Sequence, residues 1–392
     1  MFKRVVAVLF SFTIYAGALT FVVCVDTQTY YIDPSVSSSG TGTTTNSPLK
    51  YWSDVTWANG ATYLQKRDTT AYEMVEITEN DNADNITIGA YGTGNTPPVI
   101  NGGVDYVNRT WTAYNTTNYP NVYYTPHDGG TRFVGTLVVD EECQENTGYP
   151  EVSVGALNND LEFWISSSTG RIYLYCSQGN PSAVYDKIML ADKKQGIRVT
   201  GQSGVTVKDI HVKMTYAGGI DLYHCDNFLI ENCIVSYLGG FLNSPPDGRA
   251  GNGIDVYNGN SNGKIVNNLC YQIWDWGIAV EHWDDSGSGN STNILIANNV
   301  IQLSGGGIEV AALSGQLSGI ISDVVVSNNV VFNSGYGWAG ATGNLHGRGI
   351  SALGVVTGEV LAPCDNLTVV DNMVDGFRSY GIKMQDCRNI NV

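Results

Sequence analysis

The sequence predicts an all-β chain that winds as a single-stranded parallel β-helix with three short strands per coil. Two repeated phrases lead to this prediction. The phrase Gly-Ile-x-apolar begins at residues 196, 219, 253, 277, 307, 349 and 381. Each of the first six copies is followed by an alternating apolar phrase with a polar pair inside it, such as FLIENCIV or ILIANNVI. The copies at 196 and 219 are too close for a strand–helix–strand unit but suit three strands and three turns.

The polar pairs predict a tight inner corner at which side-chain amides stack from coil to coil. One predicted column contains Asn268, Asn299, Asn329 and Asn372, and its neighbour contains Asn232, Asn267, Asn298 and Asn328. A stacked amide donates to one neighbouring coil and accepts from the other, which satisfies polar groups that are costly to bury unpaired. We therefore expect an asparagine ladder in the core.

The composition is rich in glycine and acidic. The 392 residues include 46 glycines, only 15% are charged, and the formal net charge is −17. A globular chain of this length often needs two cores, but a solenoid grows by stacking and escapes that limit. A strongly negative surface repels phosphate backbones, so we expect no nucleic-acid partner.

The first 24 residues predict an exported protein. A basic MFKR is followed by the apolar stretch 5–23, which is the pattern of a signal peptide and indicates a secreted, extracellular or cell-surface protein. A leader left uncleaved would act as a membrane anchor, the one membrane association that the sequence indicates. The eight cysteines show no CxxC or zinc-binding spacing, so we expect most of them to be small core residues.

The remaining chain divides into two parts in the sequence. Residues 25–195 are expected to form a β-rich N-terminal region with inserted hairpins, and residues 196–392 the regular coils. The chain ends at DCRNINV, where the last coil should enter its ladder strand, and no polar cap follows. We therefore expect that further residues follow Val392 in the complete protein.

On these repeats the chain resembles the right-handed parallel β-helix superfamily of pectate lyases, polygalacturonases, alginate lyases and related epimerases. YYIDP (30–34) and ITIGAYGTGNTPPVING (86–102) look like the first segment of secreted bacterial members, and FWISSSTGRIYLYCSQGNP (163–181) looks like the hairpin that precedes their regular coils. The resemblance covers nearly all of the mature chain. It implies the fold more strongly than the chemistry, because the superfamily hosts lyases, hydrolases, epimerases and non-catalytic proteins. The NTD…DD…GHG…RIK series of polygalacturonases is absent, and YTPHD (124–128) only partly matches the DPHD of mannuronan epimerases.

Alternation within each Gly-Ile-x-apolar strand predicts two columns that face outward. The first column is Arg198, Asp221, Asp255, Ala279, Glu309, Ser351 and Lys383; the second is Thr200, Tyr223, Tyr257, Glu281, Ala311, Leu353 and Gln385. Expanded loops enter these strands at 238–252 and 334–348 and leave them at 282–293, 311–322 and 354–365. Loops on both edges of one face predict a cleft, and the resemblance implies that this strand carries the active site.

The acidic residues of this face are the main catalytic candidates. They are Asp221, Asp255, Glu281 and Glu309, with Arg348 and Lys383 as further candidate bases or neutralisers. Neighbouring coils repeat at about 4.8 Å, so the first two carboxylates should lie roughly 5 Å apart. One answer to their repulsion is Ca²⁺ held by Asp221, Asp255 and Glu309, which suits elimination on a uronate-containing polysaccharide. The other is a raised pKa on one carboxyl group, which suits hydrolysis.

Substrate binding is expected from residues that flank the acids. The candidates are Tyr223, Tyr257, Trp283, Arg249 and His282, whose rings and charges suit sugars. The pattern favours a secreted polysaccharide-degrading enzyme, a lyase before a glycoside hydrolase. The alternative is a non-catalytic surface adhesin, filament subunit or glycan-binding β-helix. The exposed edges of an open solenoid also allow self-association.

Overall fold

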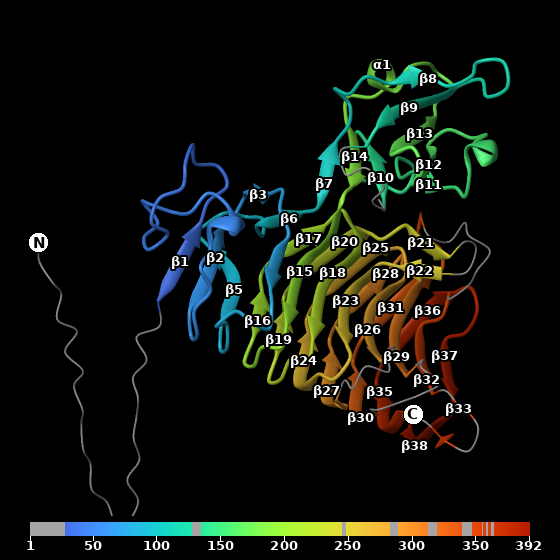
Figure 1. Ribbon diagram of the computed structural model, residues 1–392. Helices are drawn as coiled ribbons and strands as arrows, with labels where there is room; N and C mark the ends of the chain where they lie inside the picture. Colours follow the sequence, from blue (N-terminus) through green and yellow to red (C-terminus); the bar gives the residue numbers. More distant parts are fainter. Residues whose placement is uncertain are drawn as a thin grey trace, which may run out of the picture.

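A computed structural model describes residues 28–127, 135–244, 248–282, 289–312, 320–338, 347–354, 356–357, 360–361 and 364–392. In these residues three long parallel sheets form the faces of one solenoid, and successive coils stack along its axis (Figure 1). The leader 1–24 and Trp283 lie outside the described residues. No helix in the described part of the chain is long and apolar enough to cross a membrane.

The first sheet contains one strand from each coil and begins in the N-terminal region. Its strands, in spatial order, are β1 (Thr29–Ile32), β2 (Thr62–Lys66), β5 (Thr87–Tyr91), β16 (Thr206–Lys208), β19 (Leu229–Glu231), β24 (Ser261–Val266), β27 (Ser291–Ala297), β30 (Ile321–Ser327), β35 (Cys364–Val370) and β38 (Cys387–Asn391). The second sheet follows it around the coil. It contains β3 (Thr70–Ala71), β6 (Val99–Asn101), β17 (His211–Lys213), β20 (Ile234–Leu238), β25 (Leu269–Ile273), β28 (Val300–Gln302), β31 (Val330–Ser334) and β36 (Met373–Phe377).

The third sheet carries the Gly-Ile-x-apolar phrases, and we call it the GIxV sheet. It contains β4 (Val75–Ile77), β15 (Lys193–Thr200), β18 (Thr215–Tyr223), β23 (Asn252–Tyr257), β26 (Trp276–His282), β29 (Gly306–Ala312), β32 (Ile350–Leu353) and β37 (Ile382–Gln385). Two antiparallel hairpins project from coil corners: β21 (Phe241–Ser244) with β22 (Gly248–Ala250), and β33 (Val356–Thr357) with β34 (Val360–Leu361).

Residues 103–191 leave the solenoid after β6 and return at β15, and we call them the inserted subdomain (Figure 1). They form β7 (Gly103–Asp105), β8 (Thr112–Ala113), β9 (Val122–Pro126), β10 (Leu137–Val139), β11 (Tyr149–Pro150), β12 (Glu162–Ser166), β13 (Arg171–Tyr175), β14 (Ile188–Ala191) and α1 (Pro181–Val184). Two short 3-10 helices cover Trp52–Asp54 and Val154–Ala156. The hairpin expected within 163–181 is confirmed, since β12 and β13 pair antiparallel.

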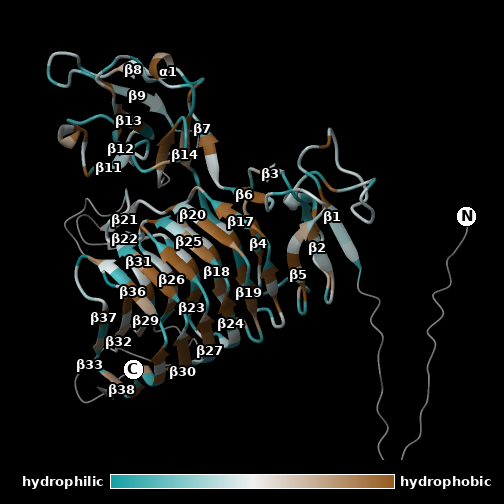
Figure 2. Ribbon diagram, turned by 180° about the vertical axis from the view of Figure 1, so that it is seen from behind, coloured by the Kyte–Doolittle hydropathy of each residue, from teal (hydrophilic) through white to brown (hydrophobic). Residues whose placement is uncertain are grey.

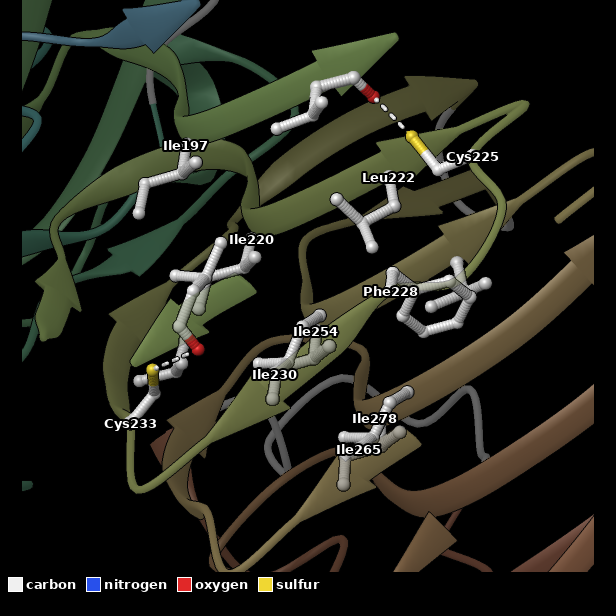
Figure 3. Packing of buried hydrophobic residues seen from close by; sticks show 14 of the residues in the cluster. Ile197, Ile220, Leu222, Cys225, Phe228, Ile230, Cys233, Ile254, Ile265 and Ile278 are labelled. Carbon is white, nitrogen blue, oxygen red and sulfur yellow. Dashed lines mark hydrogen bonds between the residues drawn. The ribbon is translucent and has the colours of Figure 1, made fainter. Parts of the chain in front are cut away.

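The solenoid core is built from side chains that repeat on every coil. The isoleucine of each Gly-Ile phrase stacks on the next, as Ile197, Ile220, Ile254 and Ile278 show in Figure 3. Figure 2 shows hydrophobic residues along the strands of the coils. The glycine before each isoleucine allows close packing, because a Cβ on Gly219 would come within 2.4 Å of the Gly253 carbonyl oxygen.

The predicted asparagine ladder is present. Asn299 Oδ1 accepts from the Asn268 backbone N–H at 2.9 Å and from its side-chain amide at 3.0 Å, and Asn329 serves Asn299 in the same way. Each amide also donates to a core carbonyl, as Asn299 does to Ile265 at 2.9 Å. Cysteine replaces asparagine near the start of this column, where Cys233 donates its thiol to the Val207 carbonyl.

The prediction for the neighbouring column is wrong. Asn232, Asn267, Asn298 and Asn328 are exposed and have φ values of 53°, 59°, 57° and 55°, in the left-handed region. Asparagine tolerates this conformation better than most residues. Their shared feature is therefore a backbone turn, and the ladder is a single column at this corner.

The ladder makes a testable contribution to stability. We expect Asn299→Ala to lower the free energy of unfolding by about 2–4 kcal/mol, because it leaves a buried N–H and a buried carbonyl without partners. Urea unfolding followed by circular dichroism measures this loss. The matched control is Asn298→Gly, which keeps the positive φ of an exposed turn and should change stability little. Equal effects of the two substitutions would contradict the ladder's role.

Candidate active site

The register of the GIxV sheet places both predicted columns as expected. Arg198, Asp221, Asp255, Ala279, Glu309, Ser351 and Lys383 pair on successive strands, and so do Thr200, Tyr223, Tyr257, Glu281, Ala311, Leu353 and Gln385. The carboxyl groups of Asp221 and Asp255 therefore start from adjacent strands, about 4.8 Å apart. Glu281, in the second column, lies one strand beyond Asp255. Glu309, in the first column, lies two strands beyond Asp255.

The expectation that both columns face solvent is wrong for the middle of the sheet. Glu309 is 3% exposed and Glu281 is 6% exposed, whereas Asp221 and Asp255 are half-buried. An aromatic side chain covers part of this face: a Cβ on Gly306 would lie only 2.2 Å from the indole ring of Trp276, which is itself buried. The acids therefore occupy the floor of a largely desolvated region instead of an open surface.

Two polar residues that the sequence analysis missed join the cluster. Asn252 donates its side-chain amide to Asp255 Oδ2 at 3.2 Å and to Glu281 Oε1 at 3.3 Å, while its own oxygen accepts from the Trp276 N–H. Asp275 is 8% exposed, and its charge acts on the pKa values of Asp255 and Glu309. Both residues stand one or two positions before a Gly-Ile phrase. Comparison of the residues that precede each phrase could have identified them from the sequence.

Burial governs the protonation of the acidic cluster. Desolvation raises the pKa of Asp221 to about 7, against the hydrogen bond from Gln195 and the charges of Arg198 and Lys194, which lower it. Desolvation raises the pKa of Asp255 well above its usual range, and the charges of Glu281 and Asp221 raise it further. The pKa of Glu309 is raised to about 8, again mainly by desolvation. A hydrogen bond with Glu281 and the Arg348 charge oppose this rise.

The acids have incomplete hydrogen bonding in the described part of the chain. The Oδ1 atoms of Asp221 and Asp255 are buried without a hydrogen-bond partner there, and so are Arg348 Nε and Ser351 Oγ. A Cβ on Gly218 would collide with the Asp221 carboxyl group, so this glycine makes room for it. These buried atoms therefore form a group of polar positions on one face that the described residues leave without hydrogen bonds.

The calcium site expected at Asp221, Asp255 and Glu309 stays a prediction. Among the described residues no three His, Cys, Asp or Glu side chains are grouped closely enough to hold a metal ion. Ala279 lies between Asp255 and Glu309, so the expected three-carboxylate set is interrupted by one strand. Protonation of a buried carboxyl group is the other way in which the repulsion between these acids is relieved.

Positive charges lie at the two ends of the cluster. Arg198 stands one strand before Asp221, and Arg348 acts on Glu309 from the other end. Lys383 lies two strands beyond Glu309, and burial together with the Arg348 charge lowers its pKa. Arg249 lies in β22, and the description of the structure does not extend to its side chain.

Two tyrosines extend the site along the second column. The rings of Tyr223 and Tyr257 lie 4.9 Å apart at 38°, and the Arg198 guanidinium lies 5.7 Å from the Tyr223 ring. The Asn258 amide donates to the Tyr223 hydroxyl at 3.1 Å. His282, in contrast, is completely buried, and its neighbour Ala312 belongs to the solenoid core. The expectation that His282 binds substrate on this face is wrong, because strand alternation turns it inward.

Comparisons with known proteins agree with this architecture. Residues 195–354 match the family described as right handed beta helix region. The fold of the chain is a right-handed parallel β-helix. A comparison of its sequence with curated proteins gives no match.

Several solved structures of low sequence identity are similar to this chain. XylC in complex with xylose is 12% identical, with a TM-score of 0.52 over 91% of this chain and 69% of that chain. A glycoside hydrolase is 11% identical, with a TM-score of 0.46 over 92% of this chain and 96% of that chain. A rhamnogalacturonan lyase is 13% identical, with a TM-score of 0.41 over 91% of this chain and 73% of that chain. At 12% identity the likeness to the XylC structure concerns the fold alone.

The raised pKa values predict how stability depends on pH. Asp221 and Glu309 bind protons more tightly when folded, with pKa values of about 7 and 8 against 3.8 and 4.5 for the free groups. Unfolding therefore releases protons between about pH 4 and pH 8, and stability falls as pH rises through this window. We expect the melting temperature to fall over this range, and Glu309→Gln to reduce the fall.

Differential scanning calorimetry across the same pH range measures this effect. Glu79→Gln, which changes an exposed acid in the N-terminal region, is the control and should leave the slope unaltered. A melting temperature that does not depend on pH, or an equal slope in Glu309→Gln and the parent protein, would contradict burial of protonated acids in this cluster.

Proposed function

We propose that this β-helix protein hydrolyses a neutral polysaccharide with the carboxyl pair Asp221 and Asp255. The observation that carries the proposal is that two in-register acids stand on adjacent strands in unequal surroundings. Burial raises the pKa of both, but Gln195, Arg198 and Lys194 oppose the rise at Asp221, whereas the Glu281 charge adds to it at Asp255. Such a pair supplies one carboxylate and one carboxylic acid at the same pH. Their strand spacing of about 4.8 Å suits the separation of about 5 Å in retaining glycosidases.

Asp255 is the proton donor in this proposal. Desolvation first, and the charges of Glu281 and Asp221 after it, raise its pKa well above the usual range, which favours its protonated form. The proton passes to the glycosidic oxygen as the bond from that oxygen to the anomeric carbon breaks. The Asn252 side-chain amide donates to Asp255 Oδ2 at 3.2 Å, and Asp255 Oδ1 has no hydrogen-bond partner among the described residues.

Asp221 is the nucleophile. Arg198, Lys194 and the hydrogen bond from Gln195 favour its ionised form over that of Asp255. Its carboxylate attacks the anomeric carbon and forms a glycosyl ester. Asp255, now ionised, then takes a proton from water, and the resulting attack on the same carbon releases Asp221.

Tyr223 and Tyr257 are placed to bind the sugar next to the cleaved bond. Their rings form a continuous aromatic surface beside the two acids, since each tyrosine lies two residues after one of them on the same strand. Aromatic rings offer a flat apolar face and a polar edge to a sugar. The XylC structure, which shares the fold, contains xylose, and a neutral sugar suits this acidic floor.

Elimination on a uronate is the second candidate, and Lys383 is the observation that favours it. Burial and Arg348 lower the pKa of this lysine, which would help it to remove a proton beside a carboxylate. The in-register acid pair, by contrast, supplies both a proton donor and a nucleophile for hydrolysis. Hydrolysis therefore stands first, although the sequence alone favoured a lyase.

Product analysis separates the two reactions. The protein is incubated with xylan, galactomannan, polygalacturonate and alginate, with and without a chelator, and new reducing ends and ultraviolet absorbance are recorded. We expect reducing ends from a neutral polymer, no unsaturated product, and no effect of the chelator. Ultraviolet-absorbing product from polygalacturonate or alginate would support elimination instead, and no product from any polymer would contradict both reactions.

Substitution of the pair tests the assigned roles. We expect Asp255→Asn to lower kcat by about 100- to 10,000-fold, because the proton donor is lost. Asp221→Gly should be inactive and partly rescued by azide, which replaces the carboxylate as nucleophile and yields a glycosyl azide. Asp226→Asn, which changes an acid at the turn after β18, is the control and should retain activity. Full activity of Asp255→Asn would remove this site from consideration.

The pH profile of kcat/KM tests the same pair independently. Activity should rise with pH through about 7 as Asp221 ionises, and should fall at higher pH as Asp255 loses its proton. Arg198→Gln should move the acidic limb to higher pH, because it removes a charge that lowers the pKa of Asp221. Lys208→Gln, on the first sheet, is the control. An acidic limb below pH 5 that does not respond to Arg198→Gln would contradict the role of Asp221.

A further inference from the structure

A cavity of about 600 Å³ lies between the inserted subdomain and the coil corner that follows β31. Its lining includes Tyr149, Glu151 and Glu162 from the subdomain and Tyr336, Trp338 and Arg378 from the solenoid. A volume of this size is within the range of small-molecule sites. The cavity is separate from the acidic cluster and plays no part in the reaction proposed for it.

Polar contacts between the two parts of the chain form the cavity. Gln144 of the subdomain donates to the Tyr336 carbonyl at 3.3 Å and accepts from the Gln272 amide at 3.3 Å. Gln272 in turn accepts from both Trp338 N–H groups, the backbone one at 3.0 Å and the indole one at 2.9 Å. These hydrogen bonds hold the subdomain against the coils and fix the positions of the cavity walls.

The lining combines aromatic faces with hydrogen-bond acceptors. Tyr336 is 47% exposed and has the Arg378 guanidinium 5.3 Å from its ring centroid, while the buried Trp338 packs on Trp274 at 4.5 Å. Glu162 is fixed by the backbone N–H groups of Asn158 and Asn159, so its place in the wall does not depend on a ligand. The pKa of Glu151 is raised by burial and by the Glu162 charge.

The cavity adjoins the segment that leads to the acidic cluster. A Cβ on Gly347 would come within 2.7 Å of Arg378 Cβ, so the chain there packs directly against a cavity residue. The next residue, Arg348, acts on Glu309 and is hydrogen-bonded through its carbonyl to Gly307 of the GIxV sheet. The segment Gly347–Arg348 therefore links a cavity residue to the Glu309 end of the acidic cluster.

We propose that this cavity binds a further unit of the neutral glycan chain, away from the bond that is cleaved. A sugar stacks on Tyr336, and its hydroxyl groups donate to Glu151 and receive hydrogen bonds from Arg378. The three acids of the lining, Glu151, Asp160 and Glu162, outnumber its single arginine, which selects against uronates. The inference rests on the proposed function for the choice of a neutral polymer, but binding here does not require catalysis.

Affinity electrophoresis of the full chain tests the proposal in native gels that contain arabinoxylan, galactomannan or polygalacturonate. Asp255→Asn serves as the reference, because it binds without cleaving. We expect a neutral polymer to retard the reference and Tyr336→Ala in that background to bind it about tenfold more weakly, the loss expected when one aromatic contact is removed. Tyr336→Phe keeps the ring face and should restore retardation. Tyr72→Ala, which removes a tyrosine that is 57% exposed in the N-terminal region, is the matched control.

Other results overturn the proposal. Equal retardation of the reference, Tyr336→Ala and Arg378→Ala would overturn it. Retardation by polygalacturonate alone, or by none of the polymers, would also overturn it. Loss of binding in Tyr72→Ala to the same degree would show a general effect of surface tyrosines and would also overturn it. Failure of the proposed hydrolysis is a separate result, since it appears in the product assay with the parent protein while retardation persists.

Discussion

The register between coils is the constraint on which the rest of this β-helix protein depends. Parallel strands fix it through backbone hydrogen bonds, and the buried asparagine column fixes it again at one corner, where Asn299 joins three successive coils. A shift of one residue in any coil would turn core side chains outward. The same register brings Asp221 beside Asp255, so the geometry of the candidate active site is a direct consequence of how the core is packed.

Burial then sets the pKa values of these acids. Carboxyl groups on an open strand would titrate near their usual pKa values. Trp276 and the surrounding chain desolvate this face, and desolvation favours the protonated form of neighbouring carboxyl groups. Unequal surroundings separate the two partners, because Arg198 and Lys194 favour the charge on Asp221 and Glu281 disfavours it on Asp255. The inserted subdomain adds a second contact region by closing a cavity against the coils.

Repetition explains why the sequence predicted the solenoid and its columns well. Seven Gly-Ile phrases set the strand alternation, and in-register stacking converts sequence position into spatial order, so Asp221, Asp255 and Glu309 could be placed without a structure. Features that depend on non-repeated contacts were missed. The burial of Glu309 and the contribution of Asp275 depend on turns and on covering side chains. The cavity at Tyr336 depends on how the subdomain folds back, which no repeat encodes.

The central claim is that Asp255 carries a proton at neutral pH while Asp221 beside it ionises near pH 7. Carbon-13 NMR of aspartate carboxyl groups, assigned by Asp221→Asn and Asp255→Asn, measures both titrations in the full chain. The account predicts one carboxyl signal that titrates near pH 7 and a second that remains in the protonated position well above it. Two signals that both titrate near pH 4 would contradict it, because they would show that the pair is solvated and carries no acid at neutral pH.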